Sequence, residues 1–255
     1  MAGHSKWANI KHRKARQDAA KGKTWSKCSR AIIVAARNGG GDPEYNLALR
    51  YAVDEAKTAN MPKDTITKAI NRGMGELAGA AYEPVRYEGY GPAGVAIIVD
   101  CLTDNVNRTA AEMRMLFERS GGNLAKPGAV AFGFQQVGLL LIEACKASED
   151  ELIQLALESG ADDVSEVDGA WEITCTPSDL SAVRGAVVAA GIEPDSAEIT
   201  MLPSITVEIP ADTAGRVLRL IDLLQDHDDT QKVYHNAEIP REVLGKLRDE
   251  RGYSS

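Results

Sequence analysis

The N-terminal third of the chain spaces its large hydrophobic residues three and four positions apart, as on one face of an amphipathic helix. On the first such segment this face consists of Trp25, Cys28, Ile32 and Ala36. The glycines at 39–41 end the segment, and the same spacing returns over residues 44–59. Pro62 begins a third segment that closes at Gly73. The pattern predicts a small domain of three helices.

Beyond the third helix the pattern changes to strands that alternate with helices. The β-branched run at 95–102 predicts a buried strand, and residues 105–120 predict an amphipathic helix. Ser148 with Glu151 as a capping box, and Pro177 in a first turn, begin two later helices. These helices and four strands follow the βαββαβ order of a ferredoxin-like fold. The six elements are expected at 138–143, 148–159, 163–167, 171–175, 177–190 and 197–202.

The last segments with a regular pattern are too short to form a domain alone. Residues 205–209 and 231–235 are predicted strands, and 211–225 is a predicted helix. We expect them to complete the sheet begun at residues 82–134, which makes the middle domain discontinuous. The fold class is therefore α+β and multidomain, with an N-terminal three-helix domain and two α/β domains, one of them ferredoxin-like. The expected boundaries are 1–78 for the basic helical domain, 79–134 and 204–240 for the middle domain, 135–203 for the ferredoxin-like domain and 241–255 for a charged C-terminal tail.

The net charge of −8 conceals a strong separation of charge along the chain. Residues 1–73 carry fifteen Lys or Arg against six Asp or Glu, whereas residues 74–255 carry fourteen against thirty-one. Within residues 1–37, ten basic residues face only Asp18. This distribution indicates that the N-terminal end binds a polyanion, while the acidic remainder repels indiscriminate nucleic-acid contact and is available to protein partners.

The basic N-terminal segment is the strongest chemical signal in the sequence. Lys and Arg neutralise phosphates and release counterions, and an exposed indole stacks on bases. Trp25 lies within the helical spacing and is assigned to the core instead. The alternatives are a solvated charged face and a patch for an acidic protein. The predicted nucleic-acid-binding residues are Lys6, Trp7, Lys11, His12, Arg13, Lys14, Arg16, Lys21, Lys23, Lys27 and Arg30, with an extension over Lys63, Lys68 and Arg72.

Two glycine-containing stretches match parts of nucleotide-binding motifs without the required context. Residues 89–94 match G-x-G-x-x-G, but a strand rather than a helix follows, so the stretch predicts a tight turn between strands. Residues 22–24 match the end of a P-loop, but Gln17 stands where that motif needs glycine. We therefore predict no nucleotide site, and no cofactor is expected.

One cluster of metal-ligand residue types lies after the last predicted helix. It contains Asp226, His227, Asp228 and Asp229, with His235 further along the chain. A metal-dependent hydrolase built on this cluster is a remote alternative, because no second ligand set with regular spacing accompanies it. The four cysteines lie far apart, which predicts reduced, buried residues and neither a zinc ribbon nor a disulfide. We expect no catalytic and no metal-binding residues.

Hydropathy predicts a protein that stays in the cytoplasm and does not bind membranes. No apolar stretch reaches the roughly eighteen residues that a membrane span needs. The basic N-terminus lacks the apolar segment that follows in a secretory signal.

Several stretches of the chain closely resemble the YebC/PmpR family. They are MAGHSKWANIKHRKARQDAAKGK, GGGDPEYN, ANMPKDTITKAI, YEGYGPAGVAIIVDCLTDNVNRT and GGNLAKPGAVAFGF. The chain departs from the family at Ala93, where glycine is frequent, and this weakens the expectation of a flexible turn. The resemblance implies an N-terminal helical domain and two α/β domains, the middle one discontinuous. It carries the binding role onto Lys6, Lys11, His12, Arg13, Lys14, Lys21 and Lys23.

The resemblance also implies a function. Members of the family are described as DNA-binding transcriptional regulators located in the cytoplasm, without enzymatic activity. Ribosome association with relief of stalled synthesis is a competing description, and mitochondrial relatives resemble translational activators. A DNA-binding transcriptional regulator is therefore our first hypothesis, and a ribosome-associated factor that binds ribosomal RNA is the alternative. Both need a phosphate-binding surface, and neither an RNA-binding nor a helix-turn-helix signature in the chain separates them.

Overall fold

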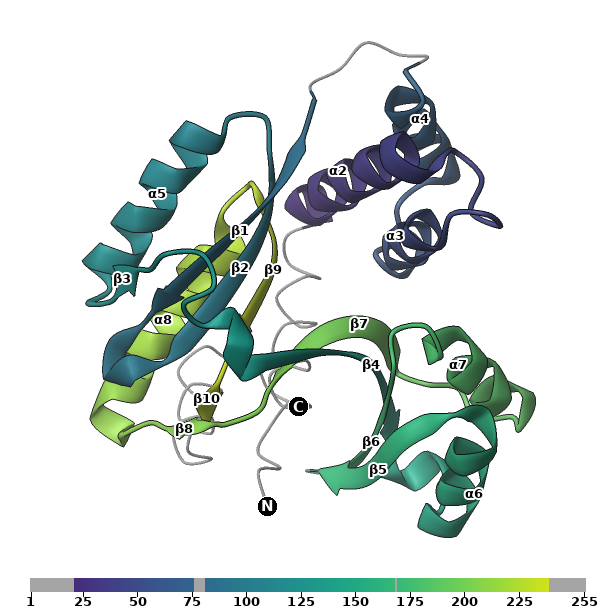
Figure 1. Ribbon diagram of the computed structural model, residues 1–255. Coiled ribbons are helices and arrows are strands. Elements are labelled where there is room, and N and C mark those ends of the chain that lie inside the picture. Colours follow the sequence, from purple (N-terminus) through teal and green to yellow (C-terminus); the bar gives the residue numbers. More distant parts are fainter. Residues whose placement is uncertain (1–20, 76–80, 168, 239–255) are drawn as a thin grey trace. The chain divides into compact units, whose positions relative to one another are not determined.

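The computed structural model describes residues 21–75, 81–167 and 169–238 of the chain. These residues fall into two compact units. One unit contains residues 21–131 and 210–235, and the other contains residues 132–209 and 236–238. The helices and strands of both units are labelled in Figure 1. The mixed α+β class predicted from the sequence is confirmed.

The first unit begins with a bundle of three helices, as predicted. Helix α2 contacts both of the others, and the three enclose a core of aliphatic side chains that includes Ile32 and Leu49. Trp25 packs against this core, and its indole N–H donates to the carbonyl of Ala59 at 2.9 Å, so its assignment to the core is confirmed. The buried Asn46 ends the preceding loop and caps α3 by accepting from the Leu49 N–H at 3.1 Å. The helices are α2 (Lys21–Gly39), α3 (Leu47–Thr58) and α4 (Lys63–Gly73).

A four-stranded antiparallel sheet forms the rest of the first unit. Its strand order is β3-β1-β2-β9, so a segment from the C-terminal part of the chain pairs with β2. Helices α5 and α8 pack on the sheet and contact each other (Figure 1). The elements are β1 (Glu83–Tyr90), β2 (Ala96–Thr103), α5 (Val106–Arg119), β3 (Asn123–Leu124), α8 (Ala211–Asp226) and β9 (Thr230–His235).

The G-x-G-x-x-G stretch forms a turn between β1 and β2, as predicted, and not a dinucleotide site. The Gly91 N–H donates to the carbonyl of Val95 at 2.8 Å and closes the turn around one 3₁₀ turn (Pro92–Gly94). Antiparallel strands lie on both sides, so no helix N-terminus is available for a pyrophosphate. Ala93 adopts φ 60°, which is the left-handed region that disfavours a side chain.

Ala93→Gly is expected to raise the free energy of unfolding by about 0.5–1 kcal/mol, because glycine adopts this backbone conformation without the steric cost of a Cβ. Chemical denaturation measures the change. Ala182→Gly, at an exposed position of a regular helix, is the matched control. It should lower the free energy of unfolding by about 1 kcal/mol. A loss of stability at both positions would show that Ala93 carries no backbone strain.

The second unit contains the predicted ferredoxin-like fold. Its four strands are antiparallel and lie in the order β5-β6-β4-β7, and helices α6 and α7 contact each other. The side chains of residues 139–142 on the central strand β4 are buried. The elements are β4 (Phe134–Glu143), α6 (Glu149–Ser159), β5 (Ala161–Val167), β6 (Ala170–Cys175), α7 (Leu180–Ala189) and β7 (Ser196–Pro203).

Local details of the second unit differ from the sequence predictions. The Ser148 hydroxyl makes no capping hydrogen bond, so the predicted capping box does not form. Helix α7 begins at Leu180 rather than near Pro177, because Thr176 Oγ1 donates to the Asp179 carboxylate at 2.7 Å and holds a turn there. The strand predicted at 205–209 is shorter than expected and does not join the four-stranded sheet of the first unit. It forms β8 (Val207–Glu208), which pairs in parallel with β10 (Ala237–Glu238).

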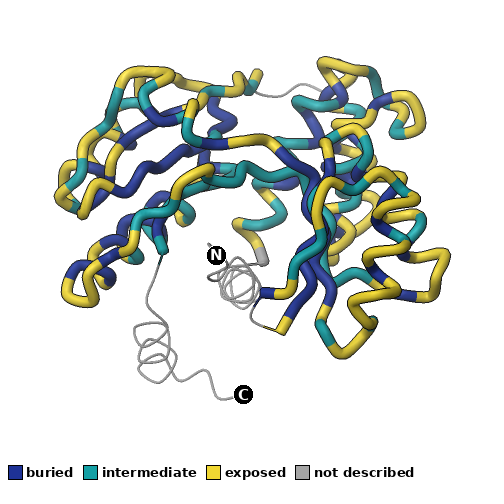
Figure 2. Tube along the Cα trace, turned by 60° about the horizontal axis from the view of Figure 1, so that its bottom comes forward, coloured by how far each residue is buried: buried dark blue, intermediate teal, exposed yellow. Residues whose placement is uncertain are grey.

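Burial follows the predicted hydrophobic patterns within each unit (Figure 2). Three of the four cysteines are buried, but Cys145 is exposed, so the prediction of four buried thiols is wrong at this position. Cys145 lies in a one-turn 3₁₀ helix (Ala144–Lys146) that directly follows β4. None of the helices in the described residues has the length and hydropathy needed to cross a membrane.

Candidate functional site

The predicted nucleic-acid-binding residues divide into three groups in the structure. Those on the first twenty positions lie outside the described residues; they are Lys6, Trp7, Lys11, His12, Arg13, Lys14 and Arg16. Lys21 is the first residue of α2. The remaining residues lie on two different helices. Lys23, Lys27 and Arg30 belong to α2, and Lys63, Lys68 and Arg72 belong to α4.

The three α2 cations contact the end of α8 and the residues that follow it. We call residues 225–229 the acidic loop, since they include three aspartates. The cations recur at intervals of four and three residues, so they lie on one face of α2. Sequence reasoning identified both segments but did not connect them, because about two hundred residues separate them in the chain.

Two lysines of α2 bind carbonyl groups at the C-terminal end of α8. Lys27 Nζ donates to the carbonyl of Gln225 at 2.6 Å, and Lys23 Nζ donates to the carbonyl of Asp226 at 3.3 Å. The last carbonyls of a helix have no partner within the helix and carry the negative end of its dipole. The two lysines therefore satisfy these carbonyls. Burial lowers the pKa of Lys27 to about 8, although the nearby Asp226 carboxylate opposes this shift.

The carboxylates of the acidic loop add to this contact. Lys23 Nζ lies 3.6 Å from Asp228 Oδ1 in a pair that is largely exposed to solvent. Arg30 donates to the carbonyl of Asp228 and lies 3.5 Å from Asp229 Oδ1. The Arg30 guanidinium also lies over the Tyr82 ring, 5.5 Å from its centre. Each of the three cations thus has an oxygen partner within the same unit.

Asp229 is the buried centre of the acidic loop. Its Oδ2 accepts from Arg108 at 2.8 Å and from the Thr109 hydroxyl at 2.7 Å, and its carbonyl accepts from the Leu102 N–H at 2.8 Å. Burial by itself raises the pKa of the Asp229 carboxyl. The hydrogen bonds from Arg108 and Thr109 and the nearby guanidinium charges outweigh burial, so the pKa lies below its ordinary value.

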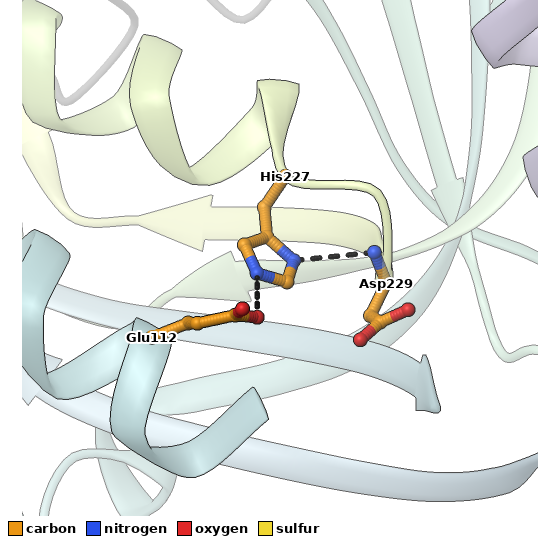
Figure 3. A group of neighbouring side chains, drawn as sticks. All are labelled: Glu112, His227 and Asp229. Atoms are coloured by element: carbon orange, nitrogen blue, oxygen red, sulfur yellow. Dashed lines mark hydrogen bonds and ion pairs between the residues drawn. The ribbon is translucent and has the colours of Figure 1, made fainter. Parts of the chain in front are cut away.

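His227 and Glu112 complete the cluster, as Figure 3 shows. His227 Nδ1 accepts from the backbone N–H of Asp229 at 3.2 Å, while Nε2 lies 2.9 Å from Glu112 Oε2. An Nδ1 that accepts a hydrogen bond carries no proton. The proton of the neutral ring therefore lies on Nε2 and is donated to Glu112.

This cluster contains residue types that ligate metals. Glu112, His227 and Asp229 place potential ligand atoms within 4.8 Å of one another. In the structure these atoms already have other partners: His227 Nε2 binds Glu112, and the Asp229 carboxylate binds two guanidinium groups and a hydroxyl. The charges of the cluster are thus compensated within the unit, and the metal-dependent hydrolase stays a remote alternative derived from the sequence.

Sequence reasoning missed the residues of α5 that hold the acidic loop. Arg108 and Thr109 lie in the first turn of α5, and Glu112 lies one turn further along the helix. Polar residues in the first turn of an exposed helix are common, and only Thr109 carried a weak signal, as a buried polar residue on an otherwise apolar face.

A cavity of about 560 Å³ lies beside the cluster within the first unit. Five carboxylates and three cations line it, so its walls are net acidic and disfavour a phosphate. The cations are Lys23, Arg30 and Arg108, and the carboxylates are Asp104, Glu112, Asp226, Asp228 and Asp229. The cavity therefore does not extend the predicted phosphate-binding surface.

The α4 cations have a different environment from those of α2. Lys63, Lys68 and Arg72 are exposed, and none of them forms an ion pair with another residue in the part of the chain that the structure describes. They provide positive charge that is open to solvent on the helical bundle. This is the property that the predicted extension of the binding surface requires.

The helical bundle, the four-stranded sheet with a C-terminal strand and the ferredoxin-like sheet define a multidomain α+β protein. Family models match nearly the whole chain: the TACO1/YebC protein N-terminal domain at residues 5–76, and the TACO1/YebC second and third domain at residues 82–237. The chain belongs to the TACO1/YebC family, and the resemblance noted in the sequence is confirmed.

Individual relatives extend over the same length. A protein of Aeromonas hydrophila is 53% identical over 97% of this chain and 100% of its own length, and one of Pelotomaculum thermopropionicum is 50% identical over 94% and 99%. Both are named "probable transcriptional regulatory protein". The crystal structure of a conserved hypothetical protein of Aquifex aeolicus is similar with a TM-score of 0.83 and 45% identity, over 94% of this chain and 99% of that one. The names of the relatives indicate a transcriptional regulator.

Proposed function

We propose that the protein is a non-enzymatic transcriptional regulator that acts in the cytoplasm and binds DNA through its N-terminal helical domain. The observation that carries this proposal is the separation of charge, with fifteen basic and six acidic residues in positions 1–73 of an otherwise acidic chain. A polyanion is attracted to the basic end and repelled by the remainder. The names of the relatives support transcription as the process.

The helical bundle supplies the scaffold for the contact. The exposed cations of α4 are proposed to contribute to the same binding surface as the basic N-terminal segment, while the α2 cations are held by the acidic loop. Contacts with phosphates position a protein on DNA without reading its sequence, so this surface explains affinity rather than the choice of target.

The ferredoxin-like domain is proposed to contact protein partners instead of nucleic acid. Residues 135–203 contain fourteen Asp or Glu and only two Lys or Arg. One of the two, Lys146, binds Asp195 at 2.8 Å. A surface with this charge repels phosphate and attracts basic proteins. We retain the three domains and the C-terminal tail with the boundaries derived from the sequence.

The combined substitution Lys11→Ala, Arg13→Ala and Lys14→Ala is expected to weaken DNA binding roughly tenfold or more and to lower the salt slope of log Kd by about one for each phosphate interaction that is removed. Fluorescence anisotropy with a labelled 30-base-pair duplex measures both quantities. Arg114→Ala, Arg119→Ala and Lys126→Ala remove the same charge from the middle domain and are the matched control. An unchanged slope in the first variant, or equal losses in both, would contradict the assignment.

The nucleic acid bound in cells decides between the two regulatory functions. Crosslinking followed by sequencing of the recovered nucleic acid is expected to yield promoter DNA. Recovery of ribosomal RNA instead would replace transcriptional control by a role on the ribosome, with the same basic surface in contact with phosphates.

A further inference from the structure

The contact between α2 and the acidic loop involves cations that were predicted from the sequence to bind phosphate. The oxygens opposite Lys23, Lys27 and Arg30 come from four residues within 225–229, at the end of α8 and just beyond it. They combine carboxylates with carbonyls at the negative end of a helix dipole. A nucleic-acid backbone offers cations a similar row of partly and fully charged oxygens.

The acidic loop is positioned by contacts that do not involve Lys23 or Lys27. Asp229 is held by Arg108 and Thr109 of α5, and His227 is held by Glu112 of the same helix. The loop is therefore preorganised against α5 and the sheet, and it would keep its shape if Lys23 and Lys27 turned to another partner. A preorganised competitor loses little conformational entropy on binding and is effective despite weak individual contacts.

The contacts of Lys23 and Lys27 with the acidic loop are weak enough to be exchanged. The Lys23–Asp228 pair is exposed and 3.6 Å long, so it contributes little in water. The hydrogen-bond acceptor of Lys27 is a neutral carbonyl, which binds an ammonium less strongly than a phosphate does. Both lysines would therefore bind more strongly to a fully charged phosphate oxygen than to these acceptors.

We propose that the acidic loop competes with nucleic-acid phosphate for Lys23 and Lys27 of α2, and so acts as an autoinhibitory contact within the fold. A phosphate becomes the main partner of Lys23 and Lys27 only by replacing the oxygens of the loop. A weak, non-specific complex does not supply the free energy needed to displace the loop. A target that makes additional contacts with the protein does. The proposal rests on the proposed function, because it concerns how strongly the same basic surface binds phosphate.

The test neutralises the loop without touching its anchor. Asp226→Asn with Asp228→Asn, both at exposed positions, is expected to tighten binding of the labelled 30-base-pair duplex by about three- to tenfold at low salt, and to steepen the salt slope by about one. Asp162→Asn with Asp163→Asn changes the charge equally at exposed positions of β5 and should alter the affinity less than about twofold. Equal gains in the two variants would show a general charge effect and overturn the proposal.

A double-mutant cycle locates the gain on α2. In a Lys23→Gln and Lys27→Gln background, neutralising the loop should no longer tighten binding; a gain that persists there would also overturn the proposal. Thermal unfolding monitors the fold of each variant. If the protein with both Asp226→Asn and Asp228→Asn is unstable, Asp228→Asn alone replaces it in the cycle. If the wild-type protein binds the duplex in a salt-dependent way but neutralising the loop does not change its affinity, only the competition between loop and phosphate is rejected. If the wild-type protein does not bind the duplex at all, the proposed function itself is rejected.

Discussion

Asp229→Ala is expected to lower the free energy of unfolding by roughly 2–4 kcal/mol. The side chain of Asp229 is only 6% exposed and joins Arg108 and Thr109 of α5 with Arg30 of α2. Its removal leaves the Thr109 hydroxyl and two guanidinium groups without their shared acceptor. The cost lies below that of a fully buried ion pair because the Arg108 side chain is 44% exposed and can turn to water.

Urea denaturation monitored by circular dichroism measures this loss. Asp228→Ala is the control, since the neighbouring carboxylate is 72% exposed and its removal should cost less than about 0.5 kcal/mol. Similar small losses in both variants would mean that the Asp229 cluster does not hold α5, the acidic loop and α2 together.

Glu88→Gln is expected to destabilise the protein by roughly 2–3 kcal/mol. Glu88 is buried on β1, and its carboxylate accepts from the backbone N–H groups of Gly128 at 2.7 Å, Val130 at 2.7 Å and Ala131 at 2.9 Å. Glutamine replaces one acceptor oxygen by an NH₂ group, which faces N–H donors and leaves at least one of them unsatisfied. The loop that follows β3 then loses its internal anchor.

Glu83→Gln provides the comparison on the same strand. Glu83 is exposed, so removing its charge should hardly change the free energy of unfolding. Hydrogen exchange of the Gly128, Val130 and Ala131 amides should accelerate in Glu88→Gln but not in the control. Protection that stays unchanged in both variants would contradict a role for Glu88 in fixing this loop.

The two carboxylates also predict how stability depends on pH. Burial acts to raise the pKa of Glu88, but three backbone N–H donors outweigh it, so the pKa of Glu88, like that of Asp229, lies below its ordinary value. A carboxyl whose pKa is lower in the folded state binds fewer protons there than in the unfolded chain. Its stabilisation is present above the unfolded pKa of about 4 and is lost as the pH falls through the folded pKa.

Charge separation, helix positions and the ferredoxin-like strand order were predictable because they depend on composition and short-range spacing. The spacing of apolar residues set the faces of α2 and α4, and the strand after Gly94 was enough to exclude a dinucleotide site. Even so, two predictions from local sequence were wrong. The capping box at Ser148 does not form, and Cys145 is exposed, next to Lys146 and two residues after Glu143.

The interactions at the candidate site were not predictable, because they join residues that no local pattern relates. Lys23 meets Asp226 across 203 positions, and Arg108 meets Asp229 across 121. The sequence alone determined how much positive charge the N-terminal domain carries, since charge depends only on composition. The tertiary structure decided which of those charges stay available: α4 leaves its cations exposed in the described part of the chain, whereas chain folding brings the end of α8 against those of α2.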